Sequence, residues 1–309
     1  MPAYHVERSL EINAPSSSVY ERIRDFHQWP AWSPWIAAEP DCSLEFFDDG
    51  NGYSWKGKII GSGTIRVSSE VPNESLDLDL EFLPPHRAEA KIRFLISPTP
   101  TGSQVTWMMD GTLPFFLFWM KKMMTTFIGM DYENGLKLLK DLVELGKVPF
   151  HLNFAGLRDF PAQRLISISG ESATDETLAD SIGGAFNRFV SVLDNAGFTP
   201  EGPPITRYNK FDPQKNYCSF TIGFPYSGKL PPGLPPKITI IERSATRAYV
   251  VEHTGPYRHL GTAWSAAMQR ARSKTFPFDK SAAPFEISIN DPRTTPEEEL
   301  VSHIYLPAK

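Results

Sequence analysis

The sequence predicts an α+β fold built from two successive domains, and three observations support this. The chain has 309 residues, whereas single hydrophobic cores stop growing near about 250–300 residues. Its first half contains a series of strand-like segments followed by one long segment with helical periodicity. Its second half contains the order strand, helix, strand, strand twice. We therefore expect residues 1–147 and 150–309 to fold as separate domains, joined near Gly146–Pro149.

The first half opens with an alternating strand, Val6–Ile12, and a short helix that begins at Pro15 and carries Val19, Tyr20 and Ile23. The clearest later strand is Ser75–Leu83, in which leucines alternate with acidic residues. Such alternation is typical of an antiparallel sheet with one dry face. Six strands are expected in this region: Ser43–Phe47, Tyr53–Ile60, Gly63–Ser69, Ser75–Leu83, Arg87–Ser97 and Gln104–Asp110.

After Pro114 the apolar residues recur with the period of a helix. A curved antiparallel sheet and a long C-terminal helix often enclose a cavity, so the apolar stripe is expected to serve both as core and as cavity wall. The stripe consists of Phe116, Met120, Met123, Phe127, Met130, Leu138, Leu142 and Leu145.

Three segments of this half carry a specific likeness: Val6–Pro15, Val19-Tyr20 and the aromatic run Asp25–Trp35. Together they resemble the polyketide cyclase/START-like (SRPBCC) superfamily over roughly residues 4–146. The resemblance implies a helix-grip fold around an apolar ligand cavity. It implies no single chemistry, because the superfamily includes lipid carriers, hormone receptors, cyclases and stress proteins.

The second half contains an internal β-α-β-β repeat, and two such units are expected to pack with pseudo-two-fold symmetry around a groove. The first copy comprises Arg164–Gly170, a helix over Leu178–Ala196, Pro204–Pro213 and Tyr217–Phe224. The second comprises Arg247–Gly255, a helix over Leu260–Arg272, Pro284–Pro292 and Glu299–Leu306.

Within the second copy, Val251–Tyr257, Leu260, Ala263-Trp264 and Phe285–Pro292 strongly resemble the gyrase-inhibitor-like (GyrI-like), AraC-type effector-binding domain over roughly residues 150–308. The resemblance implies a pocket between the repeats, lined by aromatic residues and holding one buried acid. The family binds bulky, often cationic aromatic compounds, and some members are similar to hydrolases that open cyclopropane rings. In regulators this domain follows a helix-turn-helix region, whereas here it follows a START-like half. We therefore expect no direct contact with nucleic acid.

Glu286 is the first candidate for the pocket acid. Strand alternation places Glu286 and Ser288 on one face and Phe285, Ile287 and Ile289 on the other. The pattern alone favours a glutamate that points to water, but the resemblance places the buried acid in this strand. A carboxylate among aromatic rings would suit a ligand cation or a general acid or base.

Tyr208 lies in the matching strand of the first copy, so the symmetry brings it toward the same groove. An ordinary strand tyrosine is an equally good interpretation of Tyr208, and core packing is the alternative for Trp264. His253 faces the opposite side from Glu252 and is interpreted as structural. The further candidates to line the pocket are Trp264, Tyr257, Phe224 and Tyr226, the last two as its rim.

Charge and composition exclude several classes of function. The net charge is −5, with −6 in residues 1–147 and +1 in the rest, so neither half has the basic excess that phosphate binding requires. The two cysteines fall in different halves and predict no disulfide framework. The longest apolar run, Leu113–Met120, is closed by Lys121-Lys122 and is too short to span a bilayer. The N-terminus does not resemble a secretory signal.

The sequence thus predicts a cytoplasmic sensor or sequestering protein for hydrophobic or aromatic, possibly cationic, small molecules. No metal cluster or cofactor motif stands out, so neither a metal nor a cofactor is expected. Two alternatives stay open. The C-terminal pocket could hydrolyse a reactive hydrophobic compound with Glu286 and Tyr208, or the N-terminal cavity could serve a cyclase or a lipid carrier.

Overall fold

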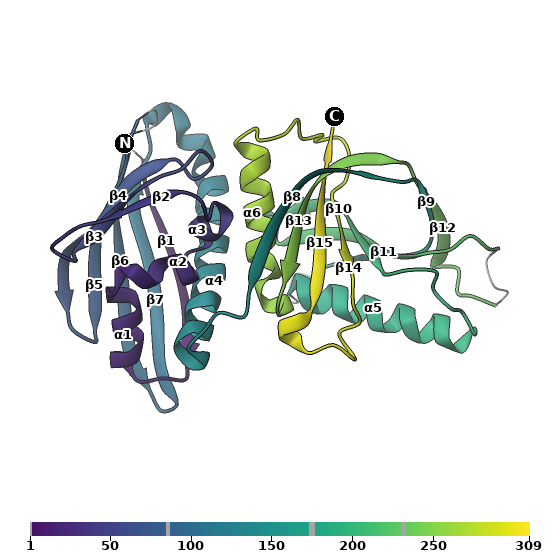
Figure 1. Ribbon diagram of the computed structural model, residues 1–309, viewed down its shortest axis with the longest axis horizontal. Helices are drawn as coiled ribbons and strands as arrows, with labels where there is room; N and C mark the ends of the chain where they lie inside the picture. The colour runs from purple at the N-terminus through teal and green to yellow at the C-terminus, as the bar shows by residue number, and fades with distance from the viewer. Residues whose placement is uncertain (1, 85–86, 173–176, 230–232) are drawn as a thin grey trace. The chain divides into compact units, whose positions relative to one another are not determined.

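The computed structural model describes residues 2–84, 87–172, 177–229 and 233–309. By their internal contacts these residues form two compact units (Figure 1). The first unit is the chain up to Phe150 together with Arg258–Ser273, and the second is His151–Tyr257 together with Lys274–Lys309. Each unit contains one antiparallel sheet, which confirms the α+β class.

The sheet of the first unit has the order β1-β7-β6-β5-β4-β3-β2. Apart from the first strand, it is a simple meander, and β1 closes it by pairing with β7 from Ala3–Thr112 to Ile12–Ser103. Its strands are β1 (Ala3–Ile12), β2 (Ser43–Phe46), β3 (Gly52–Lys56), β4 (Ser62–Val71), β5 (Ser75–Phe82), β6 (Ala88–Thr99) and β7 (Gly102–Thr112).

Strand β3 ends four residues before the sequence pattern predicted, and a buried carboxylate accounts for the difference. Glu39, only 4 % exposed, accepts hydrogen bonds from the backbone N–H groups of Lys58, Ile59 and Ile60 at 2.7, 2.8 and 3.0 Å. These groups would otherwise serve the strand ladder, so the chain turns here instead.

Helix α4 and the short helices α1 and α2 pack on this sheet or on one another (Figure 1). The interior between α4 and the sheet is aromatic: the rings of Trp107 and Tyr132 stack with centroids 4.0 Å apart, and Trp32 packs edge-on against Trp107. The helices of this part of the chain are α1 (Ser16–Arg24), η1 (Phe26–Gln28), α2 (Trp29–Trp32), α3 (Pro34–Ala38), η2 (Phe115–Met120) and α4 (Lys121–Leu145).

The apolar stripe predicted for the long helix is wrong at both ends. Leu138 and Leu142 are buried as expected, but Phe116 is 73 % and Leu145 52 % exposed. Phe116 lies in the 3₁₀ segment η2, which precedes α4. A 3₁₀ turn has three residues per turn, so a stripe extrapolated at 3.6 residues loses its phase there.

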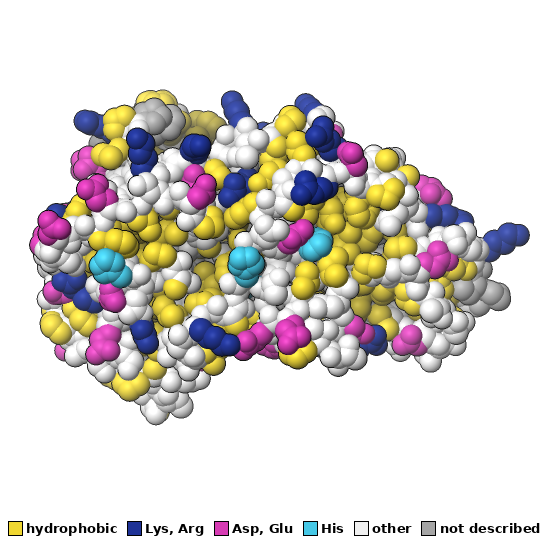
Figure 2. All heavy atoms as spheres, in the orientation of Figure 1, with side chains coloured by type: hydrophobic (Ala, Val, Ile, Leu, Met, Phe, Trp, Pro, Cys, Tyr) yellow, Lys and Arg dark blue, Asp and Glu magenta, His cyan; other side chains and the backbone are white. Residues whose placement is uncertain are grey.

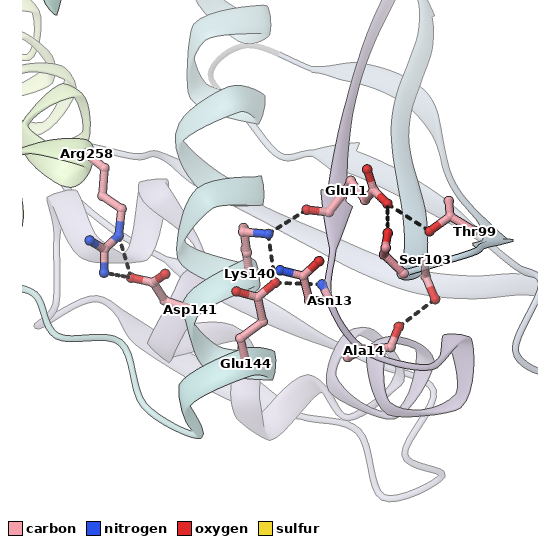
Figure 3. Close-up of polar contacts among 10 residues, drawn as sticks. Glu11, Asn13, Ala14, Thr99, Ser103, Lys140, Asp141, Glu144 and Arg258 are labelled. Atoms are coloured by element: carbon pink, nitrogen blue, oxygen red, sulfur yellow. Dashed lines mark hydrogen bonds and ion pairs between the residues drawn. The ribbon is translucent and has the colours of Figure 1, made fainter.

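Side-chain contacts fix the C-terminal half of α4 against β1 (Figure 3). Lys140 Nζ donates to the backbone oxygen of Glu11 at 2.8 Å and to Glu144 Oε1 at 2.7 Å, and Glu144 Oε1 also accepts from the backbone N–H of Asn13. On the other side of α4, the carboxylate of Asp141 accepts from Arg258 Nη2 at 2.8 Å. The same Asp141 oxygen lies 2.7 Å from Nε2 of the buried His259.

The sheet of the second unit has the order β12-β9-β11-β10-β14-β15-β13-β8. The two copies of the repeat occupy its two halves and meet where β10 pairs with β14. Its strands are β8 (His151–Phe160), β9 (Gln163–Glu171), β10 (Ile205–Asp212), β11 (Tyr217–Pro225), β12 (Ile238–Arg243), β13 (Thr246–Thr254), β14 (Phe285–Ser288) and β15 (Val301–Ala308).

The outermost strands exchange between the two copies. Strand β8 precedes the first copy but pairs with β13 of the second, and β12 precedes the second copy but pairs with β9 of the first. This exchange obeys the pseudo-two-fold relation and links the two halves of the sheet. The sequence analysis assigned no strand to either segment.

Helix α5 (Leu178–Asn195) covers one face of this sheet over β9 and β11 (Figure 1). Thr177 caps it by accepting from the backbone N–H of Asp180 at 3.1 Å. The matching helix of the second copy, α6 (Leu260–Arg272), contacts α3 and α4 and belongs to the first unit. Three 3₁₀ turns complete the described part of the chain: η3 (Pro213–Lys215), η4 (Tyr257–His259) and η5 (Glu297–Glu299).

Candidate ligand-binding site

The strand register brings the two foremost candidates to one face of the sheet. Glu286 in β14 lies opposite Thr206 in β10, and Tyr208 follows two residues later in the same strand. Residues two apart in a strand share a face, so Glu286, Thr206 and Tyr208 line the seam where the two copies of the repeat meet. The backbone N–H of Tyr208 extends this pairing by donating to the oxygen of Pro284 at 3.0 Å.

Glu286 is buried, with 7 % of its surface exposed. The strand pattern alone had favoured a glutamate in water, whereas the family resemblance had favoured burial. Burial raises the pKa of the Tyr208 phenol well above its usual value of 10, and both the charge of Glu286 and a hydrogen bond to Glu286 raise it further. Tyr208 therefore remains protonated and donates its hydroxyl proton to the carboxylate.

Tyr257 joins this cluster from the start of η4. Burial raises the pKa of its phenol, as does the charge of Glu286. Ser288 and Ser302 lie opposite each other in β14 and β15. Tyr257 is 38 % exposed, so one side of its ring reaches solvent.

His253 lies on the same face, a position that its sequence neighbours do not predict. It pairs with Ser302, which pairs with Ser288, and residues opposite one another share a face. His253 and Ser302 are both fully buried. Strand alternation relates His253 only to its chain neighbour Glu252, on the opposite face. Finding His253 and Ser302 requires the pairing of β13 with β15, and sequence periodicity does not predict which strands pair.

Comparison with protein-family models now gives the two halves an identity. Residues 3–144 match the family described as polyketide cyclase/dehydrase and lipid transport, and residues 157–309 match the GyrI-like small molecule binding domain. The chain is a polyketide cyclase-like (SRPBCC-like) domain fused to a GyrI-like domain. Both resemblances drawn from the sequence are thereby confirmed, and both halves belong to classes associated with small-molecule binding or lipid transport. None of the curated proteins that were searched matches the chain.

Three of the solved structures with detectable similarity each cover about half of the chain. MLL2253 from Mesorhizobium loti is 16 % identical, with 46 % of this chain and 97 % of that chain covered and a TM-score of 0.36. CV1439 from Chromobacterium violaceum is 18 % identical, with 46 % and 98 % covered and a TM-score of 0.35. SAV2435, solved bound to tetraphenylphosphonium, is 16 % identical, with 50 % and 92 % covered and a TM-score of 0.39.

The other three residues predicted to line the pocket are Phe224, Tyr226 and Trp264. Phe224 is 6 % exposed and packs against Phe189 beneath α5, with centroids 5.7 Å apart, so it lies in the core of the GyrI-like domain and not at a rim. Tyr226 is half-buried, stacks edge-on against Phe198 and donates its hydroxyl to the backbone oxygen of Lys229. Trp264 lies in α6, among the residues grouped with the first unit.

A cavity of about 280 Å³ lies between α5 and the strands of the first copy. Its apolar wall includes Phe189, Phe220 and Ile238, and its charged residues are Glu171, Arg188 and Lys237. None of the six predicted lining residues contributes to it. Phe220, in the cavity wall, lies opposite Tyr208 in the strand register, so the cavity borders the candidate residues without including them.

The interior of the polyketide cyclase-like domain, expected to surround a cavity, is packed with rings. Trp32, Phe94, Trp107 and Tyr132 are each at most 2 % exposed. The ring of Trp107 has its centroid 4.9 Å from that of Phe94 and 4.0 Å from that of Tyr132. These side chains contact one another, which leaves the candidate site in the other domain as the better-supported one.

Three further observations limit the chemistry of the described residues. They contain no group of three or more His, Cys, Asp or Glu side chains that could hold a metal ion. No helix among them is long and apolar enough to cross a membrane. On the face shown in Figure 2, acidic and basic side chains are interspersed with hydrophobic ones.

Proposed function

We propose that the GyrI-like domain binds a bulky hydrophobic or aromatic cation at the seam between its two repeats, with Glu286 as the counter-charge. In this proposal the protein acts as a cytoplasmic sensor or sequestering protein. The observation that carries the proposal is the burial of Glu286 in the central strands of the sheet, at 7 % exposure.

A buried carboxylate is costly unless its charge is compensated, because it has lost its hydration. The Tyr208 hydroxyl supplies a hydrogen bond to Glu286, which offsets part of this cost. A ligand cation would add an attraction between opposite charges, and the rings of Tyr208 and Tyr257 beside Glu286 would add cation–π attraction. Charge, aromatic rings and partial exposure of Tyr257 together favour a cation with an apolar surface.

Calorimetric titration with a pair of probes of equal shape and opposite charge tests this proposal. Tetraphenylphosphonium is expected to bind, and tetraphenylborate is not. The Glu286→Gln variant keeps the shape and removes the charge, and should weaken phosphonium binding by about 30-fold or more. Glu242→Gln is the matched control, because Glu242 is an exposed glutamate of the same domain. Equal binding of both probes, or full binding by Glu286→Gln, would contradict the proposal.

A hydrolase is the second candidate, favoured by the hydrogen bond between Tyr208 and Glu286. A phenol and a carboxylate in contact could assist the attack of water on a strained-ring, hydrophobic electrophile of the cyclopropanoid type. Turnover should then disappear in both Glu286→Gln and Tyr208→Phe. A protein that only binds would show no turnover, and its Tyr208→Phe variant would retain affinity for tetraphenylphosphonium.

A further inference from the structure

The 3₁₀ segment Phe115–Met120, here called the aromatic loop, exposes four large aromatic side chains in sequence proximity. Phe115, Phe116, Phe118 and Trp119 are 77, 73, 59 and 67 % exposed. Single exposed apolar residues are ordinary on protein surfaces, but a contiguous exposed patch marks an interaction site. The polyketide cyclase-like domain has a full aromatic core, so these four rings are not required to fill it.

Local contacts hold the aromatic loop in this arrangement. Leu113, just before it, is 9 % exposed, and its backbone N–H donates to the oxygen of Pro2 at 2.9 Å. Within the loop, the rings of Phe115 and Phe118 lie 6.0 Å apart, and Trp119 Nε1 donates to the backbone oxygen of Phe116 at 3.1 Å. The rings are thus presented outward by a folded backbone that is anchored at the end of β7.

The charged residues that directly follow the aromatic loop in the chain are positive. Lys121 and Lys122 follow it directly and are both exposed, and residues 111–130 contain no acidic residue. This contrasts with the net charge of −6 over residues 1–147. A third cation, Arg272, lies over Phe127 further along α4, with Cζ 4.5 Å from the ring centroid.

We propose that the aromatic loop docks on the surface of an anionic lipid bilayer. Phenylalanine and tryptophan side chains partition into the boundary between headgroups and acyl chains, and lysines at that depth are attracted to lipid phosphates. The loop needs only to enter the interface, so the apolar run Leu113–Met120, too short to span a bilayer, is sufficient. Docking would bring a small-molecule-binding protein to the phase in which apolar compounds concentrate.

A bilayer fits this patch better than a protein partner does. Four rings exposed to about two thirds present on the order of 400–600 Å², whereas a standard protein interface buries roughly 800 Å² on each partner. The rings and the two lysines that follow them also match the two layers of an anionic bilayer surface: acyl chains for the rings and lipid phosphates for the lysines. A protein partner would have to supply both features at one small contact.

Sedimentation of the full-length protein with vesicles tests the proposal. The protein should bind vesicles of phosphatidylcholine with phosphatidylglycerol, and bind vesicles of phosphatidylcholine alone much more weakly. Lys121→Gln with Lys122→Gln should weaken binding to the anionic vesicles by roughly 30-fold. Phe116→Ser with Phe118→Ser should reduce it at least as much. The controls are Lys56→Gln with Lys58→Gln and, for the rings, Phe211→Ser, which change exposed residues elsewhere.

Tryptophan fluorescence provides a second measurement that a non-specific effect would not reproduce. Trp119 is exposed whereas Trp29, Trp32 and Trp107 are at most 3 % exposed, so anionic vesicles should shift the emission to shorter wavelength. Trp119→Phe should bind vesicles and lose the shift. The proposal is overturned if the loop variants bind vesicles as the unaltered protein does, or if the loop mediates self-association and the protein fails to bind vesicles.

Discussion

Two buried regions of the molecule are filled in opposite ways. Between α4 and the first sheet, the rings of Trp32, Trp107 and Tyr132 contact one another and are essentially unexposed. On the second sheet, a run of facing positions carries Glu286, Ser302 and His253 instead. Ring packing contributes directly to stability, whereas buried polar groups are costly unless they are satisfied or used. The first interior therefore gains most of its stability from ring packing, whereas the second face concentrates the charged and polar groups that a ligand could use.

Removing a ring from the aromatic interior should have the largest effect. Trp107→Ala leaves a cavity beneath Tyr132, and should lower the free energy of unfolding by about 3–5 kcal/mol. All seven tryptophans lie in the first unit, so tryptophan fluorescence during denaturant unfolding follows this unit selectively. Trp119→Ala, at an exposed position, should change the free energy by no more than about 0.5 kcal/mol. Similar losses in the two variants would show that the interior is not tightly packed.

Adding a methyl group tests the same interior from the opposite direction. In α4, a Cβ on Gly135 would lie 2.7 Å from Trp107 Cζ3, so Gly135→Ala should destabilise by about 1–3 kcal/mol. In α5, a Cβ on Gly183 meets nothing within 4 Å. Gly183→Ala should therefore stabilise by up to about 1 kcal/mol, because alanine is the better helix former. Denaturant midpoints measure both, and equal effects at the two glycines would contradict the contrast between the units.

The polar face should respond differently to loss of its charge. Glu286→Gln keeps an oxygen that can accept from Tyr208, so the stability of the GyrI-like domain should change by less than about 1 kcal/mol. Its neighbour Ile287 faces the other side and is 4 % exposed, so Ile287→Ala should cost about 2–5 kcal/mol. Hydrogen exchange of the β14 and β15 amides measures both variants. If Glu286→Gln lost as much stability as Ile287→Ala, the Glu286 carboxylate would be required for folding and the contrast with the aromatic interior would be wrong.

Sequence periodicity predicted the helices and strands whose patterns repeat over a few neighbouring residues. It placed β5, α1 and the two copies of the repeat correctly, because alternation and helical spacing are local. It missed β8 and β12 because each pairs with the other copy of the repeat, far along the chain. The same limitation applied to the candidate site. Residue types and the family resemblance drew attention to Glu286 and Tyr208, whereas Ser302 and His253 became visible only with the strand register.

The smallest expected effect concerns the histidine that contacts Asp141 in the first unit. Burial lowers the pKa of His259 below its ordinary value of 6.5, and the bond to Asp141 opposes this only in part. Below about pH 6.5 the unfolded chain therefore binds a proton that the folded chain resists, and stability falls as the pH falls. His5 acts in the opposite direction, because its hydrogen bond to Asp110 raises its pKa.

Replacing His259 isolates its contribution. An asparagine at this position can still donate to Asp141 but does not titrate, so His259→Asn should lose less stability than the unaltered protein between about pH 7 and pH 5. Thermal unfolding followed by tryptophan fluorescence measures the difference, and His27→Asn, at an exposed position, is the control. An unchanged pH dependence in His259→Asn would mean that the imidazole accepts its proton without loss of its packing.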